Sequence, residues 1–474
     1  MPKQFDADYL IIGAGASGMA FADILVQESD KTCIIIDRYH KPGGHWNEAY
    51  SFVTLHQPSS FYGVSSKELS KGLKDRCGLN KGLNELASGA EVQAYYDNLM
   101  RESFLPSGRV EYFPMCEYVG DGAVRNLLTG EEFTVGFKDR LIDSTYYQTR
   151  IPATHTVGFP VDSAIPFIAP NDLPSAKQPS KGYTVIGGGK TAMDTCLWLL
   201  QNRVDPDSIV WIMPRDGWLL DRKNTQPTNE FFYDSIGTQA SQLEAIAAST
   251  DIDDMFLKLE AAGVFLRLDN SVLPSMFHGA TVSRAELDEL KRIKNIIRLG
   301  RVTAITQSTI QFDEHSIPTS PERIHIDCTA SAISNLEITD VFQDDAIRLQ
   351  TVRAYQPAFS AAFIAHIELN YESDEKKNQL CKVVPLPNHI EDWIELTYRN
   401  MMNQYFWSKE PGLKKWLLKN RLDGFMRVVA GVSFYEFKKL KVLNRMRKAA
   451  KPAINKLKLY RQQIESESKN DDNV

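Results

Sequence analysis

Several features that assign a chain to a protein class are missing from this sequence. Its six cysteines form no C-x-x-C or C-x4-C pair, which argues against a disulfide reductase, because that chemistry needs two neighbouring thiols. Its nine histidines show no H-E-x-x-H or clustered spacing, so we predict no metal site. The formal net charge of −6 gives no reason to expect a nucleic-acid partner.

Long apolar segments are missing as well. No run of about 18 apolar residues occurs, so no transmembrane helix is predicted. The first predicted strand, 9–12, comes almost at once, which leaves no room for a signal peptide, and we expect a cytoplasmic protein. With 43% apolar and 24% charged residues over 474 positions, the composition is that of a globular protein of two or three domains.

Two dinucleotide-binding fingerprints dominate what is present. They read Gly13-x-Gly15-x-x-Gly18 and Gly187-x-Gly189-x-x-Ala192. Each follows a β-like apolar run, at 9–12 and 183–186, and each opens a helix-like stretch. A lone match would be weak, but two in the right context predict two nucleotides held in one protein, with electrons passing between them.

Each part of a fingerprint has a physical role. The first glycine permits a tight turn, the second lets the backbone approach a pyrophosphate, and the third position keeps helix and strand close. The helix N-terminus offers free N–H groups and a partial positive charge to the phosphates. The predicted contacts are Gly13, Gly15, Ala16, Ser17 and Gly18 at the first site, and Gly187, Gly188, Gly189, Lys190, Thr191 and Ala192 at the second.

The residues after each fingerprint distinguish the two sites. A buried strand over 32–36 ends in Asp37, with Arg38 beside it; a carboxylate there accepts hydrogen bonds from ribose hydroxyls and repels a 2′-phosphate, which favours FAD or NAD. The strand over 209–213 instead leads to Arg215, whose guanidinium can pair with a 2′-phosphate, which favours NADPH. Asp216 weakens that inference, and the alternative is a surface arginine.

We expect an α/β fold with two Rossmann-type dinucleotide-binding domains and a helical C-terminal region. The FAD-binding domain would comprise 1–178 and 324–435, and the NAD(P)-binding domain 179–323 with a helical insertion at about 225–300. Strands are expected within 131–145, and the proline-rich stretch 152–179 is expected to connect the domains. A strand over 324–331 would return to the FAD domain.

Three helices are predicted from local signals. Ser283 and Glu286 look like a capping box for a helix to about Ile297. Pro357 suits the first turn of a helix that Gln356 precedes. The stretch 437–461 carries ten Lys or Arg residues among apolar ones; it is either an amphipathic helix on an anionic membrane or, as we favour, a solvated helix, and the last dozen residues are expected to be disordered.

The chain resembles the class B flavoprotein monooxygenases, which include the flavin-containing and Baeyer–Villiger enzymes. The first fingerprint with Asp37, the second fingerprint, and the arginine–tryptophan stretch 215–222 carry the resemblance. The segment Gly43-Gly44-His45-Trp46 looks like the GG-x-W segment that lies against their flavin. The likeness covers roughly 5–60, 140–225 and 320–370.

The resemblance implies that NADPH reduces FAD and that the reduced flavin activates O2 for transfer to a small organic substrate. Gly44, His45 and Trp46 would lie along the FAD. His56 and Gln57 would hydrogen-bond the flavin edge or NADP+, the alternative being a loop packed by neighbouring side chains.

Two further segments are assigned to the cofactors by the same resemblance. Thr329 and Ala330 stand where an ATG-like turn is usual. Gln356 would cap a helix that faces the flavin. These positions complete the predicted cofactor-binding set.

The sequence also departs from this family. The linker fingerprint FxGxxxHxxx(W/Y) is not matched by 154–160, and the turns at 143–145 and 328–330 lack glycine. Two alternatives therefore stay open: a two-nucleotide reductase, oxidase or dehydrogenase without oxygen transfer, and a non-catalytic binding protein on the same fold.

Overall fold

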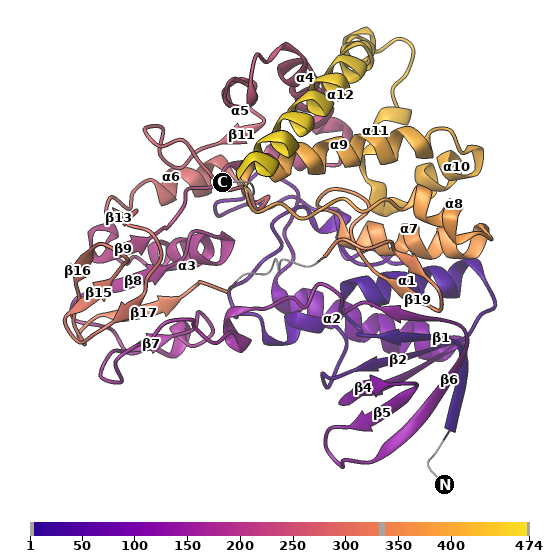
Figure 1. The fold of residues 1–474 in the computed structure, drawn as a ribbon, viewed down its shortest axis with the longest axis horizontal. Coiled ribbons are helices and arrows are strands. Elements are labelled where there is room, and N and C mark those ends of the chain that lie inside the picture. The colour runs from indigo at the N-terminus through magenta and orange to yellow at the C-terminus, as the bar shows by residue number, and fades with distance from the viewer. Residues whose placement is uncertain (1–3, 331–336, 472–474) are drawn as a thin grey trace.

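Two large sheets, the first mixed and the second all parallel, each carry a glycine-rich turn (Figure 1). The computed structural model describes residues 4–330 and 337–471. The first sheet contains, in spatial order, β18 (Phe342–Gln343), β19 (Ala346–Arg348), β6 (Glu132–Asp143), β1 (Gln4–Ile12), β2 (Cys33–Asp37) and β3 (Val110–Pro114), with β4 (Cys116–Gly120) and β5 (Ala123–Asn126) as a hairpin beside β6. The α/β fold class is confirmed.

The core of the first sheet is a sandwich of helices and strands. Helix α1 (Ala16–Glu28) packs against α7 (Pro357–Asn370), and eight of the residues of α1 are buried. Helix α2 (Gly89–Leu99) begins with a complete capping box between Ser88 and Glu91. The strands expected within 131–145 form one continuous strand, β6, because β1 pairs with it on both sides of a register shift, Ala7 with Phe137 and Tyr9 with Arg140.

The second sheet begins inside the proline-rich stretch 152–179, which was expected to be a connector only, because its edge strand β7 lies there. Its strands are all parallel and run in the order β13 (Ile296–Ile297), β9 (Ile209–Ile212), β8 (Tyr183–Ile186), β17 (Ile324–Asp327) and β7 (Phe167–Ile168). Helix α3 (Lys190–Gln201) follows β8, and a small meander of β14 (Ala304–Ile305), β15 (Thr309–Gln311) and β16 (Ser316–Pro318) lies between β13 and β17 in the chain.

One predicted strand belongs to the other sheet. The strand expected to return to the FAD domain is β17, and it pairs with β7 and β8 of the second sheet. The chain rejoins the first sheet only at β19, which pairs with β6. An isolated apolar strand carries no local signal of the sheet that it joins, so the prediction was wrong; Ser331 of that stretch lies outside the described residues.

The insertion in the second domain is mixed rather than helical alone. It contains β10 (Leu219–Asp221), α4 (Phe232–Ala248), α5 (Ile252–Ala261), β11 (Phe265–Leu266), β12 (Thr281–Val282) and α6 (Arg284–Leu290). The capping box of Ser283 and Glu286 is present. The helix ends at Leu290 rather than near Ile297, because Ile296 and Ile297 pair with β9 as strand β13.

The C-terminal third is helical, as expected. It contains α7, α8 (Asp374–Leu380), α9 (Ile390–Trp407), α10 (Pro411–Lys419), α11 (Phe425–Ala430) and α12 (Phe437–Asp471). Figure 1 shows α12 crossing the outside of the molecule against α4 and α9. The expected disorder of the last dozen residues is wrong as far as Asp471, where the helix ends.

Candidate functional site

The first fingerprint forms the turn between β1 and α1. Gly13 has φ +97°, and a Cβ there would lie 2.7 Å from the hydroxyl oxygen of Ser144. A Cβ on Gly18 would collide with the carbonyl oxygen of Gly13. The fold itself therefore requires glycine at both positions. The N–H groups of Ala16 and Ser17 begin α1 and donate to no acceptor among the described residues, as expected at a helix N-terminus.

Asp37 ends β2 beside this turn, as predicted. Its carboxylate accepts hydrogen bonds from the backbone N–H of Ala14 and, at 2.7 Å, from that of Tyr39. Its side chain is buried, and desolvation raises its pKa. A carboxylate has about four lone-pair positions, so two stay available for ribose hydroxyls. Arg38 is exposed, with its guanidinium near the ring of Tyr39.

The segment 43–46 packs against the first fingerprint. Gly44 has φ +57° and packs so closely on Gly15 that a Cβ would come within 2.9 Å of the Gly15 Cα. Trp46 is buried, and its Nε1 donates a 2.6 Å hydrogen bond to the hydroxyl of Tyr62. His45 keeps solvent contact and stacks on Trp46, yet desolvation lowers the pKa of its imidazole.

The gap between the N-termini of α1 and α7 is closed in this structure. Its lining residues include Ser17, Thr351 and Pro357, and they leave no space for even a water molecule. Gln356 occupies the N-cap position of α7 without a side-chain capping bond, and its Oε1 is buried with no hydrogen-bond partner within 4–330 and 337–471. The predicted side-chain cap is thus not formed.

The second fingerprint repeats the first turn between β8 and α3. Gly187 has φ +137°, and a Cβ there would collide with the carbonyl oxygen of Cys328, at the end of β17. Thr329 and Ala330 follow that residue, so both lie with the second fingerprint. The Thr329 hydroxyl donates to Asp327 and lies 3.2 Å from Nε2 of His155.

The middle glycine differs from its neighbours in both fingerprints. Gly15 has φ −77° and Gly189 has φ −87°, which any residue adopts. A Cβ on Gly189 would meet no heavy atom within 4 Å, and one on Gly15 would make an ordinary 3.6 Å contact with Gly44. The fold gives no reason for glycine at either position. A pyrophosphate approaching the backbone does give one.

Arg215 lies just past the end of β9, beside the second fingerprint. Its guanidinium donates a 2.9 Å hydrogen bond to Oδ1 of Asn388 and lies 3.3 Å from Nδ1 of His389. Asp216, which weakened the sequence inference, is bound at 2.6 Å and 3.0 Å by Arg298. The negative charge that follows Arg215 is therefore already paired.

A second unpaired guanidinium lies near Arg215. Ile297 of β13 pairs in register with Ile212 of β9, so the chain leaves both strands at the same edge of the sheet. Arg301 follows β13 as Arg215 follows β9, and its proximity lowers the pKa of Arg215, after the larger effect of desolvation. Neither side chain forms an ion pair with any described carboxylate.

The segment that begins against Gly15 ends against the second fingerprint helix. The hydroxyl of Tyr50 donates a 2.8 Å hydrogen bond to Oδ2 of Asp194 in α3, and Asp194 also binds the ammonium of Lys190. Phe52 stacks on Trp198 of α3, with ring centroids 5.0 Å apart. Residues 44–57 therefore connect the two fingerprints directly.

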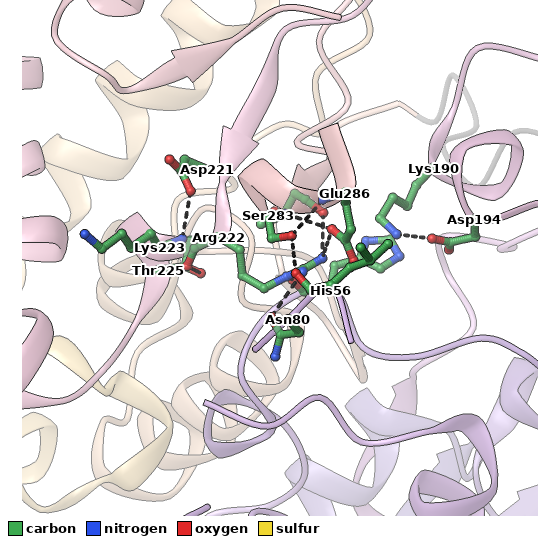
Figure 2. A network of polar contacts seen from close by, with 12 residues as sticks. His56, Asn80, Lys190, Asp194, Asp221, Arg222, Lys223, Thr225, Ser283 and Glu286 are labelled. Atoms are coloured by element: carbon green, nitrogen blue, oxygen red, sulfur yellow. Dashed lines mark hydrogen bonds and ion pairs between the residues drawn. The ribbon is translucent and has the colours of Figure 1, made fainter. Parts of the chain in front are cut away.

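His56 lies between two cations at this junction (Figure 2). Desolvation, Lys190 and Arg222 together hold the pKa of its imidazole well below the usual range. The side chains of His56 and Gln57 are half-buried, and neither hydrogen-bonds another described residue. Both therefore keep their hydrogen-bonding groups available at the junction, although their binding roles stay predictions.

Arg222 fixes the backbone of this segment and is a residue that the sequence reasoning missed. It is fully buried at 1% exposure. Its guanidinium donates to the carbonyl of His56 at 2.8 Å and to Oδ1 of Asn80 at 3.2 Å, and it pairs with Glu286 at 2.7 Å (Figure 2). The insertion thus supports the loop that carries His56. Arg222 ends the stretch 215–222, in which the sequence predicted a role for Arg215 only.

Comparison with known proteins places this chain among relatives. A family model described as an NAD(P)-binding Rossmann-like domain matches residues 11–56, from β1 to His56. Uncharacterized proteins of Mycobacterium tuberculosis and Mycobacterium bovis are each 46% identical to this chain over 421 residues, which cover 89% of it and 78% of each relative. The chain belongs to their family.

Solved structures with a similar arrangement include three enzymes. A cyclohexanone monooxygenase from Rhodococcus sp. Phi1, bound to NADP+, is 14% identical, with a TM-score of 0.47 over 80% of this chain and 89% of that one. A flavin-containing monooxygenase from Stenotrophomonas maltophilia is 13% identical, with a TM-score of 0.40 over 75% of this chain and 89% of that one. A bacillithiol disulfide reductase from Bacillus cereus is 12% identical, with a TM-score of 0.43 over 76% of this chain and 98% of that one. At these identities the likeness concerns the fold alone.

Proposed function

We propose that this chain is an FAD-containing oxidoreductase that takes its electrons from NADPH. The observation that carries the proposal is the pair of middle glycines, Gly15 and Gly189, at which the fold tolerates a side chain and a bound pyrophosphate would not. Residues 44–57 join the two turns, so two nucleotides bound at them would meet at one junction.

The residues of the first turn suit FAD. The free N–H groups at the start of α1 would hold its pyrophosphate, and Asp37 would accept hydrogen bonds from its ribose. When bound, FAD supplies a hydride acceptor whose reduced form reacts with O2. The gap between α1 and α7 is closed in this structure, so its lining side chains, Ser17, Thr351 and Pro357 among them, would have to move to admit such a group.

The residues of the second turn suit NADPH better than NADH. Two guanidiniums, Arg215 and Arg301, lie at one strand edge, and neither forms an ion pair with a described carboxylate, although the charge of Asp392 also acts on Arg215. Placing like charges together is unfavourable, and an anion bound between them relieves the repulsion. A 2′-phosphate is such an anion and accepts paired hydrogen bonds from arginine. Asp216 does not oppose it, because Arg298 neutralises that carboxylate.

The junction residues would position the reacting ends of the two nucleotides. Desolvation, and after it the charges of Lys190 and Arg222, hold the pKa of His56 well below its usual range, so the imidazole is neutral at physiological pH. One ring nitrogen then donates and the other accepts a hydrogen bond. Gln57 offers a further donor and acceptor. Lys190, held by Asp194, adds a fixed positive charge at the start of α3.

We infer a monooxygenase acting on a small organic substrate from the resemblance of the motifs, with oxygen from O2 inserted into the product. The alternative is a reductase, oxidase or dehydrogenase, and the unmatched linker at 154–160 favours it. These activities differ in what becomes of O2: an oxygenase transfers an oxygen atom to its substrate, and an oxidase releases peroxide.

The test begins with purified protein and its absorbance spectrum. Flavin released by heat is identified chromatographically, and the protein is then mixed with NADPH and 18O2 in the presence of a panel of sulfides, amines and ketones. An oxygenase yields 18O-labelled product, whereas peroxide equal to the NADPH consumed indicates an oxidase. A colourless protein that cannot be loaded with FAD would refute the proposal and favour a non-catalytic binding protein.

A further inference from the structure

The charge of this chain is unevenly distributed. Residues 409–461 carry 16 Lys or Arg against three Asp or Glu, a formal charge of +13 in a chain whose total is −6. This segment comprises α10, α11 and most of α12, which lie on one side of the molecule (Figure 1). The remainder of the chain is correspondingly acidic. Such an asymmetry gives the molecule one end that attracts anionic surfaces and a body that they repel.

Helix α12 uses its apolar face internally. Ala453, Leu457 and Tyr460 are fully buried against α4, α5 and α9, and the Tyr460 hydroxyl hydrogen-bonds Ser249 at 2.8 Å. An amphipathic helix that lies on a membrane through its own apolar stripe needs that stripe to be free. The apolar face of α12 is therefore not the part that could contact a bilayer.

The solvent-exposed side of α12 is strongly basic. It presents six exposed cations that form no ion pair with any described carboxylate: Lys438, Lys441, Arg447, Lys448, Lys451 and Lys458. Of the other four cations of α12 up to Arg461, three are paired, Lys439 with Glu436, Arg445 with Glu244 and Arg461 with Glu395, and Lys456 lies over the ring of Tyr460. We call the six unpaired cations the outer basic face. The fold supplies counter-charges where α12 touches the body and none on this face.

Three exposed aromatic side chains stand at the start of this face. Phe434 is 83% exposed, Tyr435 66% and Phe437 76%. They occupy the turn between α11 and α12, at the outer edge of the molecule in Figure 1. Large apolar groups gathered on a surface mark an interaction site, and aromatic rings beside lysines are typical of the lipid–water interface.

We propose that the 434–437 turn and the outer basic face of α12 dock the protein on the surface of an anionic phospholipid bilayer. The three rings enter the headgroup region, and the cations lie along the lipid phosphates and carboxylates. The acidic body turns away from the same surface. No described helix is long and apolar enough to cross a membrane.

The arrangement suits a bilayer better than a nucleic acid. Proteins that bind single strands interleave aromatic and basic side chains along a groove, so that successive bases stack. Here the aromatics gather at one end, and the cations continue alone along about five turns of helix from Lys438 to Lys458. One point of insertion next to an extended basic face is the pattern of an interfacial anchor.

The test is flotation of the purified protein with vesicles through a sucrose step gradient, at 70:30 phosphatidylcholine to phosphatidylserine and with phosphatidylcholine alone. The wild type is expected to float with the anionic vesicles at 0.1 M salt and to be released at 1 M. Replacing Lys438, Lys441, Lys448 and Lys451 by Gln should lower the partition coefficient by two to three orders of magnitude, at about fivefold for each charge. Phe434→Ser with Phe437→Ser should lower it independently of salt.

A matched control separates local from overall charge. Lys81, Lys138, Lys177 and Lys294 are exposed and distant from α12, and replacing these four by Gln changes the net charge equally. This control is expected to float like the wild type, and all variants should elute as the wild type does in gel filtration. Failure of the wild type to float, equal binding to neutral vesicles, equal loss in the control, or preferential binding of heparin or RNA would each overturn the proposal.

Discussion

Substituting Gly189 by alanine is expected to leave the fold intact and to remove NADP+ binding. The backbone at this position is extended, with φ −87°, and a Cβ would meet no heavy atom within 4 Å. Alanine at a helix N-cap destabilises a protein by roughly 0.5–1 kcal/mol relative to glycine. Alanine also lowers the conformational entropy of the unfolded chain, which stabilises the fold by about 0.4–1 kcal/mol. The free energy of unfolding should therefore change by less than about 0.5 kcal/mol.

The expected effect on the ligand is much larger. A methyl group at Gly189 would occupy the space in which a pyrophosphate meets the N–H groups of Lys190 and Thr191. Losing two hydrogen bonds to a charged group, at roughly 1.5–3 kcal/mol each, lowers the affinity by about two orders of magnitude or more. The first turn offers a matched case, because Gly15→Ala should spare the fold and reduce FAD retention.

The assay is calorimetric titration with NADP+, which needs no turnover, together with urea unfolding of each variant. Gly412→Ala, also at an open position, is the control and should change neither property. Gly18→Ala is the opposite control: its Cβ would collide with the Gly13 carbonyl, so that variant should lose stability. Unchanged NADP+ affinity in Gly189→Ala would refute the assignment of the second turn, and loss of folding would refute the steric reasoning.

Three further outcomes are expected. Arg301→Gln should weaken NADP+ binding by about 10- to 150-fold through one lost charged hydrogen bond while NAD+ affinity stays constant; parallel losses for both nucleotides would contradict a 2′-phosphate site. Arg222→Met should reduce the free energy of unfolding by about 3–5 kcal/mol, because Glu286 would stay buried without its partner; a loss below about 1 kcal/mol in urea unfolding would show that the network carries little stability. Burial raises the pKa of Asp23 to about 6 against an ordinary value of 3.8, so its native form binds an extra proton and stability falls as pH rises from about 4 to 6, by up to about 3 kcal/mol. Asp23→Asn should lack that slope in unfolding curves measured across this range, and equal slopes would count against the shift.

The sequence predicted the elements that local chemistry specifies. Both glycine turns, the acid that ends β2, the capping box at Ser283 and the helix that begins at Pro357 lie where their residues indicate. Each depends on a backbone angle or a cap that a few neighbouring residues determine. Such features can be read without knowing what packs against them.

The wrong predictions concern elements whose structure depends on a partner that is distant in the sequence. Strand β17 joins the second sheet because it pairs with β8, and Ile296 and Ile297 are a strand because β9 lies beside them. Arg222 reaches across to the carbonyl of His56, 166 residues earlier in the chain. No local pattern encodes these contacts. The pairing of Asp216 with Arg298, which keeps that carboxylate from neutralising Arg215, could not be predicted for the same reason.

The central claim is that NADPH delivers electrons to a flavin held at the first turn. The most direct measurement is anaerobic stopped-flow absorbance at 450 nm after the FAD-loaded protein is mixed with NADPH or NADH at equal concentration. The account predicts rapid bleaching of the flavin by NADPH and much slower bleaching by NADH. A flavin that stays oxidised with both nucleotides would contradict it, and faster bleaching by NADH would contradict the role of Arg215 and Arg301.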